Sequence, residues 1–292
     1  MKKYIALLVS LLLVCMVSFA LAAEGPFVPG EDFAEYEIEN ASGYNVVTVN
    51  MLITAGEDKI FDGKVKLTSD SLLASEFTQA AVFEAGCGAD GIESGFVTFI
   101  GDYANGPDAN GNYVCWTYTV NGKYVPLACN QFVLLEGDYI HWDYVAFSDS
   151  SEDVSEVVEA APTGFDPPFE VGEDETEYEV EGASGYTVET VNVKIVAGED
   201  VLFNGKVKLT SDTVLASEFT QAAVYEAGCG ADGIESGFVT YIGDYANGND
   251  ADGNYVYWSL SINGKYVPVS CNQIAVLDGD YILWDFVTYV AE

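Results

Sequence analysis

The chain has 292 residues, 49% of them apolar, and carries a formal net charge of −37 with ten lysines and no arginine. An apolar content this high excludes a generally disordered chain. The charge excludes nucleic acid as a partner, because cationic side chains that neutralise phosphates supply most of that affinity, and it disfavours anionic membrane surfaces. Two roles for the charge remain, solubility in an extracellular medium and capture of cations or a basic partner.

The first 22 residues are typical of a secretory signal. Lys2 and Lys3 precede an apolar run over Ile5–Val17, and Ala20 and Ala22 supply small residues for cleavage. We therefore expect a signal peptide over residues 1–22 and a secreted, extracellular product, with the cell surface as a further location. The alternative is an uncleaved membrane anchor, because the apolar run approaches a spanning length.

Most of the remaining chain is one sequence written twice. Residues 26–148 align with residues 168–290 at a constant offset of 142 without a gap, and roughly seven in ten positions are identical. The repeat predicts two equivalent domains, each long enough to bury its own core. An acidic linker over residues 149–167 joins them, and its composition predicts a solvated, semi-extended segment.

The hydrophobic periodicity of each repeat predicts an α+β fold. In the first copy, strands are expected over Val46–Thr54, Ile60–Leu67 and Phe96–Ile100, where β-branched and aromatic residues are enriched. Apolar residues at helical spacing predict a helix that begins near Leu72, capped by Ser69-Asp70, and ends at Gly86. We expect two tandem β-grasp-like domains, each with one helix packed on a mixed or antiparallel sheet.

A three-strand meander closes each repeat. Its central strand begins at Asn112, and an Asn-Gly turn and a Gly-Asp turn follow. Alternation predicts that one face buries against the helix, and this face carries Val114, Trp116, Tyr118 and Val120, matched by Val256, Trp258, Leu260 and Ile262. We therefore expect the tryptophans in the core rather than in a ligand platform.

The opposite face of the meander is more polar. Its tyrosines, which are Tyr113, Tyr139, Tyr255 and Tyr281, are candidate ligand-binding residues, and exposed sheet tyrosines with no such role are the alternative. His141 also lies on this face, and its counterpart is Leu283. A metal or catalytic role shared by both repeats is therefore excluded for the only histidine. A role unique to the first copy remains, with a partly exposed sheet residue as the alternative.

Four of the cysteines are repeated. Cys87 and Cys129 match Cys229 and Cys271, and in an exported protein this pattern predicts one disulfide per domain, Cys87–Cys129 and Cys229–Cys271. Two thiolates without a nearby histidine are too few ligands for the alternative, a zinc site. Cys115 has no cysteine counterpart, so we expect a free thiol or an intermolecular contact there.

No catalytic constellation is evident in the sequence. A Ser-His-acid or Cys-His arrangement would depend on the unrepeated His141. Asp250–Asn254 has some likeness to a calcium loop but lacks the spacing and the bidentate glutamate, which favours an ordinary turn. We expect a protein that is not an enzyme, with no metal site and no required cofactor.

The meander motifs Trp116–Gly122 and Leu135–Trp142, with Trp258–Gly264 and Leu277–Trp284 in the second copy, resemble the transcobalamin C-terminal-like domain family. The resemblance implies a β-grasp-like fold over most of each repeat. In cobalamin carriers this domain closes over the vitamin from one side. The large helical domain that covers the other side has no counterpart in this sequence. Prokaryotic surface proteins also use the domain without an established ligand.

Two functions follow as expectations. The first is a secreted, non-catalytic ligand-binding protein, with cobalamin or another corrinoid as the ligand that the resemblance implies. The second is an extracellular adhesion or protein-interaction module whose partner is a cell-surface protein and which takes no small molecule. A hydrolase that uses a pair of carboxylates is the weakest alternative, because no pair stands out among so many acids.

Overall fold

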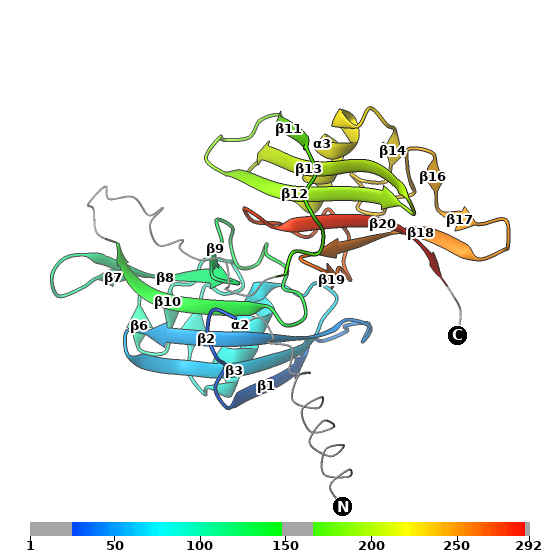
Figure 1. Cartoon of the computed structure of the whole chain (residues 1–292). Coiled ribbons are helices and arrows are strands. Elements are labelled where there is room, and N and C mark those ends of the chain that lie inside the picture. Colours follow the sequence, from blue (N-terminus) through cyan, green and yellow to red (C-terminus); the bar gives the residue numbers. More distant parts are fainter. Residues whose placement is uncertain (1–24, 148–165, 290–292) are drawn as a thin grey trace, which may run out of the picture.

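The computed structural model describes residues 25–147 and 166–289, which form two repeated, sheet-dominated domains (Figure 1). Each domain has one helix and a main sheet. The predicted signal peptide and the linker up to residue 165 lie outside the described residues. Among the residues described, no helix is both long and apolar enough to cross a membrane.

The first domain contains one helix and ten strands within its described residues. They are β1 (Asp32–Glu37), β2 (Val46–Ala55), β3 (Asp58–Thr68), α2 (Ala74–Glu84), β4 (Ala89–Asp90), β5 (Phe99–Ile100), β6 (Tyr103–Ala104), β7 (Gly106–Pro107), β8 (Tyr113–Val120), β9 (Lys123–Tyr124) and β10 (Tyr139–Phe147). The predicted strand Phe96–Ile100 is therefore limited to Phe99–Ile100. The segment that follows, up to the central strand of the meander, contains β6 and β7.

The second domain repeats these elements in the same order. They are β11 (Asp174–Glu179), β12 (Val188–Ala197), β13 (Asp200–Thr210), α3 (Ala216–Glu226), β14 (Ala231–Asp232), β15 (Tyr241–Ile242), β16 (Tyr245–Ala246), β17 (Gly248–Asn249), β18 (Tyr255–Ile262), β19 (Lys265–Tyr266) and β20 (Tyr281–Tyr289).

The main sheet of each domain is mixed. In the first domain the strand order is β1-β3-β2-β10-β8-β7, with β9 paired to β8. The hairpin strands β2 and β3 are antiparallel, whereas β2 and β10 run parallel at the centre of the sheet and β1 runs parallel to β3. Side chains of β2 alternate between buried and half-buried, with Val49, Met51 and Ile53 fully buried. This alternation is the burial pattern expected of a central strand with one covered face.

The helix begins four residues after the predicted cap. Glu76 in its first turn accepts a hydrogen bond from the Leu73 N–H (3.0 Å) and from the hydroxyls of Ser69 and Ser71 (both 2.7 Å). Ser69 is thus tied to the helix start without being the N-cap, because a turn through Leu72 (φ 54°) lies between them. The buried face of α2 packs mainly on β3 and β1.

The predicted buried face of the meander is confirmed except at Val256, which is half-buried, and the helix covers only part of this face. Trp116 and Trp258 are each 6% exposed. Trp142 reaches the helix, because its Nε1–H donates to Thr78 Oγ1 at 2.9 Å. Trp116 Nε1–H instead donates to the Tyr103 carbonyl at 2.9 Å. The loop around β5 and β6, rather than α2, therefore closes this end of the core.

The two domains meet through equivalent surfaces. Lys123 Nζ lies 2.6 Å from Asp280 Oδ1, and Lys265 Nζ lies 2.5 Å from Asp138 Oδ1. Each aspartate is mostly buried and also accepts from its own repeat, since Asn121 Nδ2–H donates to Asp138 Oδ1 at 3.0 Å. The two ion pairs are therefore reciprocal: the lysine of each repeat pairs with the equivalent aspartate of the other repeat.

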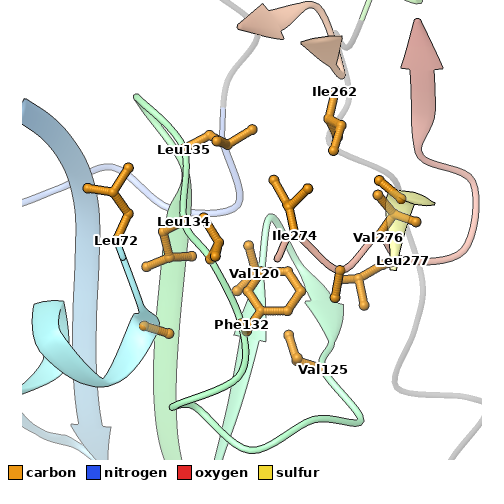
Figure 2. Close-up of a cluster of buried hydrophobic side chains, with 14 of the residues drawn as sticks. Leu72, Val120, Val125, Phe132, Leu134, Leu135, Ile262, Ile274, Val276 and Leu277 are labelled. Atoms are coloured by element: carbon orange, nitrogen blue, oxygen red, sulfur yellow. The ribbon is translucent and has the colours of Figure 1, made fainter. Parts of the chain in front are cut away.

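Apolar side chains fill the space between these ion pairs. Figure 2 shows those of the first repeat facing those of the second, and the lining includes Val120, Phe132, Leu135, Ile262, Ile274 and Leu277. The cavity left among them is about 30 Å³, too small for more than a few water molecules. The two domains are therefore packed together by an apolar contact with charged pairs beside it.

Candidate ligand-binding site

The four predicted tyrosines do not form one platform. Tyr113 lies opposite Phe147 at one end of the β8–β10 pair, and Tyr139 begins β10 at the other end. The separation is about 27 Å at the usual rise of a strand. Phe27 also covers Tyr139, with ring centroids 5.2 Å apart. In the second domain Phe169 packs on Tyr281 at the same distance, so the segment before the first strand of each repeat packs on this face.

The predicted disulfides Cys87–Cys129 and Cys229–Cys271 are not formed, and all five cysteines of the described residues are free thiols. The members of each pair lie at opposite ends of the helix. The Cys129 carbonyl accepts from the Ser75 N–H in the first turn, whereas the Cys87 N–H donates to the Val82 carbonyl in the last turn. About 10 Å of helix separates these positions, whereas a disulfide needs Cβ atoms about 4 Å apart.

The remaining candidate residues are held by local contacts. His141 Nε2 lies 2.9 Å from Thr54 Oγ1, and burial lowers the pKa of the imidazole although Asp143 acts in the opposite direction. Cys115 is a free, half-buried thiol whose pKa is raised by burial. Asp250 accepts hydrogen bonds from the N–H groups of its own turn. The described residues contain no group of three or more His, Cys, Asp or Glu side chains that could hold a metal ion.

A repeated aromatic pocket lies instead along the edge of each main sheet. We call it the edge pocket. In the first domain it is about 280 Å³ and is lined by residues that include Phe96, Trp116, Tyr124, Pro126 and Trp142. In the second it is about 440 Å³ and is lined by residues that include the equivalent Phe238, Trp258, Tyr266, Pro268 and Trp284. Asp70 of the first domain and Tyr255, one of the predicted ligand-binding tyrosines, also line the second pocket.

The floor of the edge pocket is rigid. Tyr118 stacks on Trp142 with ring centroids 4.8 Å apart, and the Tyr118 hydroxyl donates to the Leu127 carbonyl at 2.9 Å. Trp116 packs on Tyr144 with centroids 5.2 Å apart. The buried Tyr118 hydroxyl and the indole N–H groups of Trp116 and Trp142 all have hydrogen-bond partners. These rings are therefore fixed in one arrangement before any ligand binds.

The rim of the edge pocket is exposed. Phe96 and Tyr124 are 66% and 56% exposed, and their counterparts Phe238 and Tyr266 are each 69% exposed. Gly95 sets the position of Phe96, since it adopts φ +86° and a Cβ there would lie 2.2 Å from Asn130 Oδ1. Both repeats thus expose large aromatic side chains to solvent beside a concave surface. Such an arrangement is typical of a binding site.

The sequence contains a feature that could have identified this rim, but the predicted strand pattern obscured it. The sequence pattern predicts Phe96 inside a strand, where an aromatic side chain packs, but the strand starts only at Phe99. Tyr124 lies in β9, close to the tight hairpin turn at Asn121 and Gly122, which both have positive φ. An aromatic residue retained in both copies next to a turn is the feature that could have revealed the site.

The domains match one known family. The model for the family described as Domain of unknown function (DUF4430) matches residues 75–146 and 212–288, just over half of the chain, in two tandem copies. The chain belongs to this family. Both edge pockets lie within the matched residues, apart from Asp70 at the rim of the second one. A search of the curated proteins found no match for this DUF4430 chain.

Proposed function

We propose that this DUF4430 chain is a secreted, non-catalytic binding protein in which each repeat holds its ligand at the edge pocket. The observation that carries the proposal is the exposed rim formed by Phe96 and Tyr124 and repeated by Phe238 and Tyr266. Exposed aromatic groups around a concave floor supply contact area for a ligand at low entropic cost. The signal-like pattern of residues 1–22 supports export.

A non-catalytic role agrees with the state of the potential nucleophiles. Burial raises the pKa of Cys129 and of Cys271 to about 11, and it also raises the pKa of the Cys87 and Cys229 thiols. Thiols with raised pKa values are protonated near neutral pH and are poor nucleophiles.

A corrinoid is the first small molecule to test. The resemblance of the meander to the transcobalamin C-terminal-like family supports it. The strand order also supports a β-grasp-like assignment, because β2 and β10 are parallel neighbours flanked by β3 and β8. A large amphipathic ring suits a shallow pocket with an aromatic rim, which offers ring faces without enclosing the ligand.

The test is titration of cyanocobalamin into the purified chain, followed by its absorbance spectrum and by protein fluorescence. We expect a saturable change that weakens at least tenfold when Tyr124 and Tyr266 are both replaced by alanine. The matched control replaces Tyr44 and Tyr186, which are 90% and 94% exposed and line none of the edge pockets. A wild-type chain that gives no saturable change would remove corrinoids as the ligand.

The second candidate function is a surface adhesion or protein-interaction module without a small-molecule ligand. A specific observation favours it, since each edge pocket opens onto a part of the sheet edge that no other strand of the described residues covers. Exposed sheet edges are sites at which another polypeptide chain adds a strand.

A further inference from the structure

The edge of β8 is covered at both ends and open in the middle. Gly106 and Pro107 of β7 pair with Val114 and Tyr113, while β9 pairs with Thr119 and Val120. Residues 115–118 between these pairings have no neighbouring strand on that side within the described chain. Residues 257–260 of β18 are open in the same way. Each gap is about 13 Å long at the usual rise per residue.

Two of the outward backbone groups in this gap already have partners. The Trp116 N–H donates to Asn105 Oδ1 at 3.1 Å, and the Tyr118 carbonyl accepts from the Val125 N–H at 3.5 Å. The second repeat makes the same two bonds, since the Trp258 N–H donates to Asn247 Oδ1 and the Leu260 carbonyl accepts from the Val267 N–H, both at 3.1 Å.

The other two outward groups are left for a ligand. Because Val120 bonds to Lys123 across the hairpin, every second residue back along β8 also points its N–H and carbonyl to the open side. The Trp116 carbonyl and the Tyr118 N–H therefore face the gap, one on each side of Thr117, and no residue of the described chain bonds to either on that side. One acceptor and one donor with this spacing match one bridging unit of a β-ladder.

We propose that each edge pocket binds a short extended segment of a partner protein, which adds a strand opposite Thr117 in the first repeat and Ser259 in the second. The segment donates a backbone N–H to the tryptophan carbonyl and accepts from the N–H of Tyr118 or Leu260. Its side chains contact the rim formed by the exposed Phe and Tyr residues. This inference rests on the proposed function and names the ligand of the same site.

The surroundings define the segment further. Since β7 and β9 close both ends of the gap, about three residues of the partner fit between them. The segment is therefore a loop or a chain terminus rather than a long strand. Asp70 lines the second pocket, no lysine lines either one, and the chain carries a net charge of −37. Charge complementarity favours an uncharged or cationic segment and opposes an acidic one.

The experiment selects a phage-displayed library of random dodecapeptides on the full chain and then measures the dissociation constant of an enriched synthetic peptide by fluorescence anisotropy. Each residue of that peptide is N-methylated in turn, which removes one backbone donor and keeps every side chain. We expect one position at which N-methylation weakens binding at least tenfold, about 1.4 kcal/mol, with its two neighbours changed less than threefold. We also expect the Tyr124→Ala, Tyr266→Ala variant to weaken binding and the Tyr44→Ala, Tyr186→Ala control to retain it.

The outcomes separate this inference from the proposed function. Failure to enrich any peptide, or binding that no N-methyl group weakens, overturns the added strand. If cyanocobalamin then binds and depends on Tyr124 and Tyr266, the proposed function stands without the inference. If the enriched peptide and cyanocobalamin are both indifferent to these two tyrosines, the edge pocket is not the binding site and both proposals fall.

Discussion

The contact between the two repeats contains a carboxyl group that ought to make stability depend on pH. Glu189 in β12 occupies the position of Val47 in β2, which is only 5% exposed. Burial raises the pKa of Glu189 from 4.5 to about 7, with a further increase from the neighbouring Asp278 and Asp280, while Lys123 of the first repeat acts in the opposite direction. The folded protein therefore holds a proton there that the unfolded chain releases more readily.

The sign of the effect follows from proton linkage. Between the unfolded pKa of 4.5 and the folded pKa of about 7, the folded state binds more protons, so the free energy of unfolding falls as the pH rises. Above this window the carboxyl is ionised in both states and the destabilisation is complete. A shift of this size corresponds to about 3 kcal/mol, and screening of this partly exposed group reduces it to about 1–2 kcal/mol.

The assay is urea-induced unfolding of the wild type and of Glu189→Gln at pH 5 and pH 8. We expect the variant to be about 1–2 kcal/mol more stable than the wild type at pH 8 and nearly equal at pH 5. Glu189→Val, which restores the residue of the first repeat, should stabilise at pH 8 as well. Glu175→Gln is the matched control, because Glu175 is exposed on β11. A difference between Glu189→Gln and the wild type that is the same at both pH values would refute the reasoning.

Three further predictions concern an ion pair between the repeats, the cysteine thiols and a buried hydrogen bond. A double-mutant cycle on Lys123→Met and Asp280→Asn, measured by urea unfolding, should give a coupling free energy of about 1–3 kcal/mol. As a control, Lys66→Met removes one member of an exposed ion pair and should lower the free energy of unfolding by less than about 0.5 kcal/mol. A coupling free energy near zero would contradict the contact between the repeats. Thiol titration of the denatured, unreduced chain should count all five cysteines of the described residues as free, and a count of one would restore the two disulfides. Thr78→Val should cost about 1–3 kcal/mol, because it leaves the buried Trp142 N–H without an acceptor; unchanged stability would show that this bond contributes little.

The elements that the sequence predicted well are those set by local pattern. Alternation along the meander identified the dry face of β8, and helical spacing identified α2 to within a few residues. Both signals arise within one element, because a strand exposes every second side chain and a helix turns every 3.6 residues. Because the repeats align at a constant offset, each pattern could be compared with its copy in the other repeat, and the tandem organisation was evident.

The prediction of the two disulfides was wrong because it depended on a distance between elements. A repeated cysteine pair shows that Cys87 and Cys229 are equivalent, but equivalence does not place either one near its presumed partner. Likewise, Tyr113 and Tyr139 share one face of the sheet, yet nothing in the strand pattern states that they stand at opposite ends of it. Such separations depend on register and on the path of the loop after the helix, and neither has a local signature.

The contact between the repeats shows that a duplicated sequence does not determine which lysine pairs with which aspartate. Lys123 and Lys265 are equivalent, as are Asp138 and Asp280, so pairing within each repeat and pairing between repeats satisfy the sequence equally. The structure pairs them between repeats, where each aspartate also accepts bonds from its own domain. Since every repeat carries both halves of this contact, a change at Asp138 or Asp280 removes one ion pair and leaves the other. The two sides already differ at one position, since Glu189 near Asp280 stands where the first repeat has Val47.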